Sequence, residues 1–211
     1  MATNINGFFT GELQPDTIIA GCINIYENAW PNPEETIKLI ESQVANTDSG
    51  VAWQRAGTVG DGPYQNIRTN RIIHITEGAN ISNNKALQQV HNQFYLALLA
   101  ATVPYTARYN IRENLFHEGY SILKYSADEE YKQHYDSGTE MGRTISVLVY
   151  LNGDYTGGEL EFPYFGIKIK PEPGMMIIFP SNYAYTHIAK PVTNGTKYAL
   201  VTWIKDRHVG K

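Results

Sequence analysis

Two side chains with metal-binding chemistry lie two positions apart in the segment Tyr-Lys-Gln-His-Tyr-Asp-Ser, namely His134 and Asp136. In an extended strand, positions i and i+2 project from the same face, so an imidazole and a carboxylate there would reach one point. A second imidazole, that of His187, lies far downstream and can complete the set from a distant strand. The pattern predicts a metal ion held by two histidines and one carboxylate.

This ligand set indicates a particular kind of metal site. Two histidines and one carboxylate on one side of an ion are the arrangement of non-haem iron(II) oxygenases, which leaves the other side open for substrate and oxygen. Each residue also has an ordinary explanation, since a His-X-Asp triplet arises by chance and a lone histidine is more often structural. Lys197, ten positions after His187, could be an edge charge of an apolar strand. The occurrence of all four in this order favours the metal site.

Length and composition limit the class of protein. With 211 residues, of which 42% are hydrophobic and 18% charged, we expect a single globular domain over residues 1–211. The net charge of −4 and the lack of a lysine or arginine run argue against nucleic acid as a partner. The chain has no signal-like start and no apolar run of about 18 residues, so we expect a cytoplasmic protein without a membrane anchor. Cys22, the only cysteine, excludes an internal disulfide and a thiolate cluster, and the oligomeric state stays open.

Helix signals come early in the chain. Asn32 as an N-cap and Glu35 as the second half of a capping box predict a helix over residues 33–46. Apolar residues at helical spacing predict a second helix from about 82 to 101. Between them, the glycine-rich segment 48–70 is expected to be a long connection that folds over substrate as a lid.

Strand signals dominate from residue 117 onward, where short β-branched and aromatic runs are separated by Gly, Pro and Asn turns. Helices followed by about eight strands predict a mainly β fold with supporting helices (α+β), as a β-sandwich or jelly roll with the helices on one sheet. The expected strands are 119–125, 131–136, 144–151, 159–162, 166–169, 175–179, 184–188 and 197–204.

Short motifs succeed one another through residues 119–203, and their order and spacing resemble the iron(II)- and 2-oxoglutarate-dependent dioxygenases, most closely the prolyl 4-hydroxylase branch. The resemblance implies a double-stranded β-helix (jelly roll) as the catalytic core over 117–205. Residues 1–116 would be its variable helical support, with Ile67-Arg68-Thr69 as an echo of the family. The motifs are Ile122-Leu123-Lys124-Tyr125, Tyr131-Lys132-Gln133-His134-Tyr135-Asp136-Ser137, Arg143-Thr144, Val149-Tyr150-Leu151-Asn152, Gly157-Gly158-Glu159-Leu160-Glu161-Phe162-Pro163, Pro173-Gly174, Ile178-Phe179-Pro180, His187, Pro191-Val192, Gly195-Thr196-Lys197-Tyr198 and Trp203.

The resemblance implies roles for five residues. His134, Asp136 and His187 would bind iron(II), and Lys197 would pair with the distal carboxylate of 2-oxoglutarate. Tyr125 takes a position whose hydroxyl helps to hold this cosubstrate in relatives. Charge counting agrees, because iron(II) with one aspartate carries about +1, the dianionic cosubstrate brings the centre to about −1, and one buried lysine restores neutrality.

The substrate side is less sharply defined. Arg143 and Trp203 resemble positions near the peptide-binding groove, although packing or a surface ion pair explains both nearly as well. Many prolyl hydroxylase relatives carry threonine after Gly-Gly-Glu, where this chain has Leu160. This departure concerns the contacts to 2-oxoglutarate and leaves the metal ligands unaffected.

The resemblance implies hydroxylation of an unactivated carbon coupled to decarboxylation of 2-oxoglutarate to succinate and carbon dioxide, with iron(II), O2 and ascorbate. Proline in a peptide or protein is the first expectation for the substrate. Two alternatives stay open: the same chemistry on another side chain or a small molecule, and a non-catalytic jelly roll that binds peptide or carbohydrate. The intact set of four polar residues, from His134 to Lys197, favours the enzyme.

Overall fold

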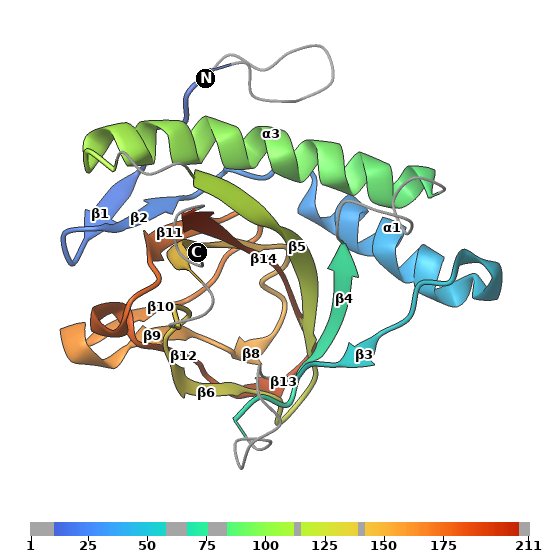
Figure 1. Cartoon of the computed structure of the whole chain (residues 1–211). Coiled ribbons are helices and arrows are strands. Elements are labelled where there is room, and N and C mark those ends of the chain that lie inside the picture. Colours follow the sequence, from blue (N-terminus) through green and yellow to red (C-terminus); the bar gives the residue numbers. More distant parts are fainter. Residues whose placement is uncertain (1–10, 58–66, 76–83, 112–114, 139–141, 207–211) are drawn as a thin grey trace.

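The computed structural model describes residues 11–57, 67–75, 84–111, 115–138 and 142–206. Within them, two layers of β-sheet are backed by two helices on one outer face (Figure 1). This arrangement confirms the prediction of a mainly β fold with helices on one sheet. The helices are α1 (Pro33–Ala45) and α3 (Lys85–Arg108), with short 3-10 turns at η1 (Thr47–Ser49), η2 (Pro163–Phe165) and η3 (Tyr183–Tyr185); the strands are β1 (Thr17–Ile19), β2 (Ile23–Tyr26), β3 (Gln54–Arg55), β4 (Arg71–Ile75), β5 (Leu115–Tyr125), β6 (Tyr131–His134), β7 (Arg143–Tyr150), β8 (Thr156–Gly157), β9 (Leu160–Phe162), β10 (Ile167–Ile169), β11 (Met176–Pro180), β12 (His187–Ala189), β13 (Val192–Asn194) and β14 (Lys197–Asp206).

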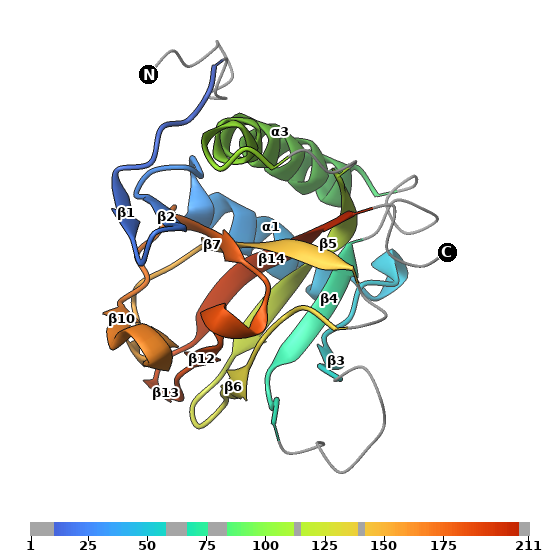
Figure 2. The same ribbon diagram turned by 60° about the vertical axis from the view of Figure 1, so that its left-hand side comes forward.

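The sheets are antiparallel and unequal in size. Among the described residues, the large sheet has the order β1-β2-β11-β7-β14-β5-β4-β3, the small sheet has the order β10-β9-β12-β6, and β8 pairs with β13. Helices α1 and α3 lie on one side of the large sheet, and β6 and β12 lie on the other (Figure 2). The long strands β5, β7 and β14 therefore form a partition between a helical layer and the space enclosed by the two sheets.

Alternation of side chains along the central strands divides the interior into two cores. In β7, Val147 and Val149 lie in the core against helix α3, whereas Leu148 and Tyr150 lie in the core between the sheets. This is the period of two expected for a strand with a different layer on each face. The same period decides which residues of β5 and β14 reach the enclosed space.

Helix α1 is fastened to the large sheet by the carboxylate of Glu41. This group accepts hydrogen bonds from the Nζ of Lys124 at 2.7 Å and from the hydroxyl of Tyr198 at 2.6 Å. Those two donors are paired neighbours on β5 and β14, and the adjacent pair in the register is Tyr125 with Lys197. Because successive residues of a strand point to opposite faces, the contact with α1 on the outer face fixes the strand ends that carry Tyr125 and Lys197 on the inner face.

Helix α3 is longer than the sequence predicted, since it ends at Arg108 and not near residue 101. Its interior contains Pro104, which has no N–H to donate to the carbonyl of Ala100. The backbone N–H of Leu13 takes that place, and donates to the Ala100 oxygen at 2.8 Å. The buried side chain of Tyr105 continues the core-facing stripe beyond the proline. Tertiary packing therefore stabilises the last turn of the helix, after Pro104.

Other local predictions differ in detail from the structure. Asn32 does not cap α1: its φ of 54° is left-handed, and its side chain makes no capping hydrogen bond, because a capping side chain requires the extended conformation. The strand expected over 184–188 begins only at His187, since Tyr183–Tyr185 form a 3-10 turn. Of the expected lid over 48–70, residues 58–66 lie outside the described part of the chain.

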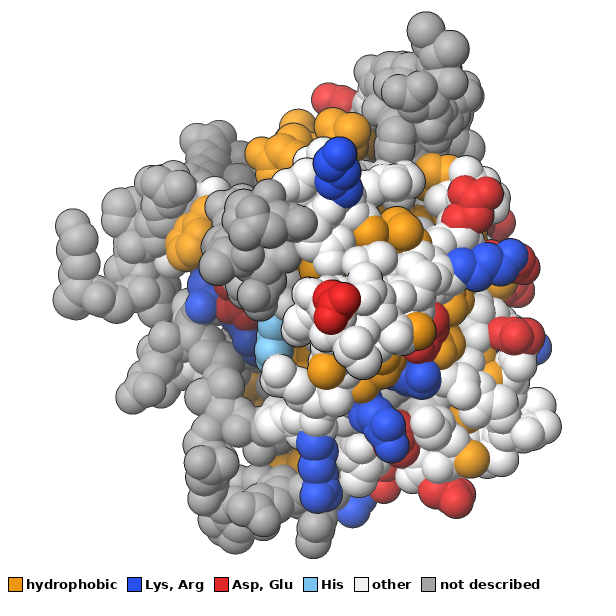
Figure 3. Space-filling model, turned by 90° about the vertical axis from the view of Figure 1, so that its right-hand side faces the viewer, with side chains coloured by type: hydrophobic (Ala, Val, Ile, Leu, Met, Phe, Trp, Pro, Cys, Tyr) orange, Lys and Arg blue, Asp and Glu red, His pale blue; other side chains and the backbone are white. Residues whose placement is uncertain are grey.

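The surface charge and the length of the helices concern two further expectations, those about nucleic acid and about a membrane anchor. Acidic and basic side chains are interspersed on the face seen from the right of Figure 1 (Figure 3). Neither of the described helices is long and apolar enough to span a membrane. The organisation as one domain over residues 1–211 stays a prediction.

The packing of α3 gives a test of the fold. Phe94 is fully buried between Trp30 and Tyr120, with ring centroids 5.9 and 4.7 Å away. We expect Phe94→Ala to lower the free energy of unfolding by about 3–5 kcal/mol, measured by urea titration. On the same helix, Leu96→Ala, at a side chain that is 43% exposed, should change it by about 0.5 kcal/mol or less. Equal effects of the two substitutions would contradict the burial of Phe94 on the core-facing side of α3.

Candidate metal centre

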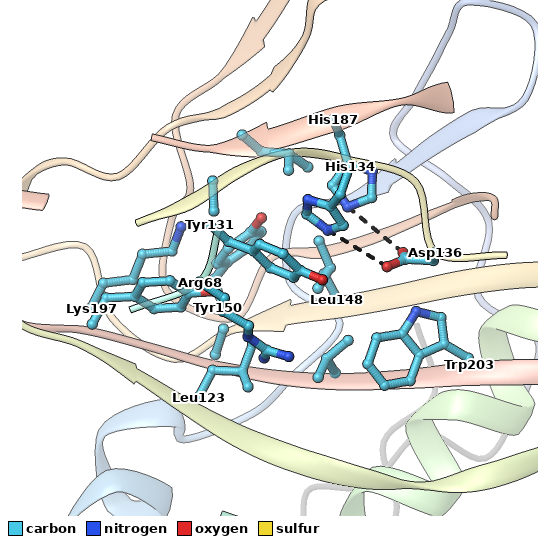
Figure 4. Close-up of a pocket in the computed structure, with 15 residues that line it drawn as sticks. Arg68, Leu123, Tyr131, His134, Asp136, Leu148, Tyr150, His187, Lys197 and Trp203 are labelled. Atoms are coloured by element: carbon cyan, nitrogen blue, oxygen red, sulfur yellow. Dashed lines mark ion pairs between the residues drawn. The ribbon is translucent and has the colours of Figure 1, made fainter. Parts of the chain in front are cut away.

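Three potential ligands meet in the space between the two sheets. Suitable donor atoms of His134, Asp136 and His187 all lie within 4.8 Å of one another. The Asp136 Oδ1 is 3.6 Å from the Nε2 of His134, and its Oδ2 is 3.6 Å from the Nε2 of His187 (Figure 4). The structure thus brings together the three residues that the sequence singled out.

Strand pairing and one backbone contact position these ligands. His134 ends β6 and His187 begins β12, and the two residues are direct partners in the antiparallel register. Asp136 lies beyond the end of β6, so the expected strand to residue 136 is too long. Instead the backbone N–H of Asp136 donates to the carbonyl of Ser181 at 3.1 Å, which ties the carboxylate to the segment just after β11.

Hydrogen bonds on the far side of each ring fix the orientation of the imidazoles. The Nδ1 of His134 lies 2.7 Å from the carbonyl oxygen of Lys132, and the Nδ1 of His187 lies 3.1 Å from that of Tyr185. A carbonyl can only accept, so in each ring Nδ1 carries the hydrogen and Nε2 presents a lone pair. Both lone pairs are on the side of Asp136, as a metal ligand set requires.

The electrostatics favour a neutral imidazole at His134 and an ionised carboxylate at Asp136. Burial, followed by the neighbouring His187, lowers the pKa of His134 to about 3. Burial by itself raises the pKa of Asp136, but the adjacent His187 and His134 and the hydrogen bond from Ser146 outweigh it, so this pKa lies below its ordinary value. At neutral pH His134 is therefore neutral and Asp136 is ionised, as the binding of a divalent cation requires.

A pair of buried serines supports the carboxylate. The hydroxyl of Ser146 lies 2.6 Å from the Oδ2 of Asp136, and the hydroxyl of Ser181 lies 2.8 Å from that of Ser146. Since an ionised carboxylate only accepts, Ser146 donates to Asp136, and its oxygen is left to accept from Ser181. This chain of donors holds the Asp136 carboxylate in place.

The donor set fits a divalent transition metal. It offers two imidazole nitrogens and one carboxylate oxygen in a buried site, and these donors suit iron(II) among the first-row ions. No thiolate takes part, because Cys22, the only cysteine, is not in the group. His134, Asp136 and His187 are therefore the residues that would hold an iron ion in this protein.

The ligands form one end of an elongated pocket whose walls are mostly aliphatic and aromatic. Figure 4 shows Leu123 and Leu148 between the ligand end and the end formed by Lys197 and Tyr150. Such walls exclude water from the space between the ends. The lining residues are Arg68, Leu123, Tyr125, Tyr131, His134, Asp136, Leu148, Tyr150, Leu160, His187, Ala189, Lys197, Ala199, Val201 and Trp203.

Lys197 is a buried cation at the opposite end of this pocket. Its side chain is 2% exposed, and its Nζ donates to the carbonyl of Gly158 at 2.6 Å. Among the described residues no carboxylate forms an ion pair with it. Burial lowers its pKa to about 7, against the opposing charge of Glu159. An anionic group at this end would restore the charge balance.

Two tyrosines border the lysine. The Nζ of Lys197 lies 5.3 Å from the ring centroid of Tyr125 and 5.1 Å from that of Tyr150. Burial raises the pKa of Tyr125 to about 12 and that of Tyr150 well above its ordinary value, so both stay neutral and can donate a hydrogen bond. Leu160, the residue that departs from the family pattern, also lines the pocket.

The two residues assigned to the substrate groove lie differently. Trp203 lines the pocket, and its indole nitrogen is turned toward Asp136 (Figure 4). Arg143 lies outside the lining: its guanidinium stacks on the Trp203 ring at 3.6 Å and pairs with Glu118, which also pairs with Lys205 at 2.6 Å. In this structure Arg143 supports the tryptophan, and the role of both residues toward substrate stays a prediction.

Several lining residues were missed by the sequence reasoning. The ring of Tyr131 stacks on His134 with centroids 3.4 Å apart, and Tyr131 precedes that ligand on the same strand. Tyr150 lies four positions after Ser146, so the alternation of β7 could have placed both on the inner face. Arg68 appeared only as part of an echo of the family, and no local pattern marks it.

Comparison with known proteins adds the family. The model of the 2OG-Fe(II) oxygenase superfamily matches residues 120–205. A probable prolyl 4-hydroxylase 9 of Arabidopsis thaliana is 31% identical over 119 residues, which cover 43% of this chain and 41% of that protein. A putative prolyl 4-hydroxylase of Acanthamoeba polyphaga mimivirus is 27% identical over 110 residues, covering 43% and 46%. The chain thus spans less than half the length of these curated relatives.

Solved structures share the fold. A prolyl hydroxylase of Trichoplax adhaerens, in complex with a hypoxia inducible factor peptide, superposes with a TM-score of 0.66 at 22% identity, covering 89% of this chain and 84% of that one. The viral collagen prolyl hydroxylase of Paramecium Bursaria Chlorella virus-1, in its 2OG complex, gives 0.62 at 18% identity, covering 89% and 97%. At these identities the likeness is one of fold, and that fold is the jelly roll expected from the resemblance.

Residues 120–205 match the 2OG-Fe(II) oxygenase superfamily, and the cluster of two histidines and one carboxylate and the jelly roll agree with this class. Within that class, the relatives make this chain similar to the prolyl hydroxylases. Members of this superfamily use iron(II), 2-oxoglutarate and O2, as the name of the family states for the first two.

The serine pair generates a prediction about metal binding. Ser146→Ala removes the hydrogen bond to Asp136, so we expect the dissociation constant for Mn(II) or Co(II) to rise about 10- to 100-fold, measured by isothermal titration calorimetry. Ser121→Ala is the matched control, because this buried serine of the same sheet bonds to His74 at 2.9 Å and does not line the pocket. Unchanged metal affinity in Ser146→Ala would contradict the supporting role.

Proposed function

We propose that this protein hydroxylates proline within a peptide or protein, using iron(II), O2 and 2-oxoglutarate and releasing succinate and carbon dioxide. One observation carries the proposal: a single pocket has three metal-binding donors at one end and, at the other, a buried lysine that forms no ion pair with any described residue. A ligand that chelates a metal through one end and carries a carboxylate at the other would satisfy both ends. 2-Oxoglutarate has this chemistry.

Each residue of the pocket has a task in this proposal. His134, Asp136 and His187 hold the ion, and Lys197 receives the distal carboxylate, with the hydroxyl of Tyr125 as a second donor. The bound iron and cosubstrate supply the oxidising chemistry. The leucine-lined walls exclude water, and the chain of serine hydroxyls keeps the Asp136 carboxylate oriented.

The relatives support proline in a peptide as the substrate. The curated matches include prolyl 4-hydroxylases from a plant and a virus, and the Trichoplax adhaerens enzyme was solved with a peptide fragment. We also propose ascorbate as the reductant that keeps the iron ferrous, and the cytoplasm as the compartment. Neither of these two proposals affects the assignment of the pocket.

A second substrate class is favoured by one further relative. A multifunctional procollagen lysine hydroxylase and glycosyltransferase of Rattus norvegicus is 29% identical over 87 residues, covering 39% of this chain and 11% of that protein. Hydroxylation of another side chain therefore remains the alternative within the same chemistry. A non-catalytic binding module is disfavoured, because such a module has no need of both the metal ligands and the buried Lys197.

Mass spectrometry tests the substrate class. Incubation of proline-containing peptides with the protein, iron(II), ascorbate and 2-oxoglutarate should add one oxygen to proline, with one succinate per hydroxylation. Asp136→Ala and His134→Ala should abolish both products. Tyr135→Ala, at the exposed residue between these ligands, is the control and should retain metal affinity. Oxygen added to lysine but not to proline would favour the alternative, hydroxylation of another side chain. If no succinate forms with any peptide, the protein is not a 2-oxoglutarate-dependent enzyme.

The lysine gives a prediction about pH. Because burial lowers the pKa of Lys197 to about 7, the amine loses its proton as the pH rises through neutrality, and the distal carboxylate of 2-oxoglutarate then lacks a cation. We expect the dissociation constant of 2-oxoglutarate for the Mn(II)-loaded protein to rise by more than about tenfold from pH 6.5 to 8.5. Calorimetry under nitrogen measures this value.

Two variants serve as controls for this pH dependence. Lys197→Arg keeps its charge over the whole range, so its profile should be flat. Lys197→Met should raise the dissociation constant at pH 6.5 by about 30-fold or more, since it leaves a carboxylate without its partner. A flat profile in the native protein would argue against Lys197 as the partner of the cosubstrate.

A further inference from the structure

The pocket contains a second buried cation that the proposed function does not use. Arg68 is 8% exposed and lines the pocket. Its Nε donates to the Oδ1 of Asn70 at 2.7 Å, which leaves the two terminal nitrogens, Nη1 and Nη2, for other partners. Among the ion pairs of the described residues, none includes Arg68. A buried guanidinium without a counterion is costly unless a ligand supplies the opposite charge.

Arg68 lies close to the reacting end of the pocket. Its guanidinium carbon is 4.7 Å from the centroid of the Tyr131 ring, and the same ring stacks on the metal ligand His134. Figure 4 shows the ring of Tyr131 between His134 and the guanidinium. A bridge between Arg68 and Tyr131 in the backbone holds this arrangement. The cation is therefore one aromatic ring away from the metal centre.

Charge counting shows what is missing. A divalent ion, the Asp136 carboxylate, dianionic 2-oxoglutarate and the Lys197 ammonium sum to about zero. Counted over the described residues, the guanidinium of Arg68 then leaves the loaded pocket with about one positive charge that has no partner. The other arginine of this region differs, because Arg143 is already paired with Glu118. One further negative charge is needed, and the substrate is the component not yet counted.

We propose that Arg68 binds the carboxylate of an aspartate or glutamate in the substrate peptide, adjacent to the target residue or next but one. This inference rests on the proposed function and adds to it a preference for acidic peptides. The two Nη groups, for which the described residues supply no ion pair, can donate to both oxygens of one carboxylate. An extended peptide advances about 3.3–3.6 Å per residue, so a neighbouring side chain spans the width of the Tyr131 ring.

The experiment compares peptides that contain one proline and differ only in charge. Each peptide carries aspartate, or asparagine in its place, at one of the four positions within two residues of the proline. Binding to protein loaded with Mn(II) and 2-oxoglutarate under nitrogen is measured by fluorescence anisotropy. We expect the native protein to bind the aspartate peptide at least about tenfold more tightly than its asparagine partner at one or two of these positions.

Variants at Arg68 assign this preference to the guanidinium. Arg68→Gln should bind both peptides of a pair with equal affinity, and Arg68→Lys should retain part of the preference. Arg71→Gln is the matched control, because it removes the same charge from an exposed residue of the adjoining strand and should leave the preference intact. The dissociation constants of Mn(II) and 2-oxoglutarate should stay within about twofold in Arg68→Gln, which shows that Tyr131 and His134 remain in place.

Four outcomes would overturn the proposal. The native protein fails to distinguish aspartate from asparagine at all four positions, or binds no peptide of the set. Arg68→Gln weakens both members of a pair equally, as for a contact to a peptide carbonyl. Arg68→Gln weakens 2-oxoglutarate instead, as for a cosubstrate contact. Since binding is measured without turnover, a failure of proline hydroxylation in the mass spectrometry would be seen separately from a failure of the acidic preference.

Discussion

The buried negative charge of Asp136 is the constraint around which the site is organised. The hydroxyl of Ser146 and the segment after β11 hold it in place, and the two imidazoles turn their lone pairs toward it. At the other end of the pocket, Lys197 carries the opposite charge, and the aliphatic wall keeps the two apart. A protein that separates complementary charges in this way is less stable for it, and the separation is useful only if a ligand joins the two ends.

Much of this site could be derived from the sequence, because strand periodicity carries the information. Lys197, Ala199, Val201 and Trp203 alternate along β14, and all four line the pocket. The same rule places Tyr125 on the inner face of β5, opposite Lys197 in the register. The ligand pattern itself needed only residue types and order. The fold followed from helices that come early and strands that come late.

The remaining features depend on contacts between distant segments, which a local pattern does not encode. Helix α3 passes Pro104 because the backbone of Leu13 replaces the missing donor. The strands β1, β2 and β4 are short and were missed, since their residues become strands only by pairing with distant segments: β2 with β11, β4 with β5, and β1 with β2 at the sheet edge. Ser146 and Arg68 have no sequence signature for their tasks, because each depends on a partner brought close by the fold.

The place of β6 has a consequence for the order in which the site is assembled. This strand lies between β12 and the segment that carries Arg68, bonded to the latter through the N–H of Lys132 and the carbonyl of Ile67 at 2.8 Å. An ion shared by His134 and His187 would act as a removable cross-link between β6 and β12. Binding of the metal would therefore make the strand next to Arg68 more rigid before the peptide binds. The peptide would then meet a binding surface that the metal ion has already ordered.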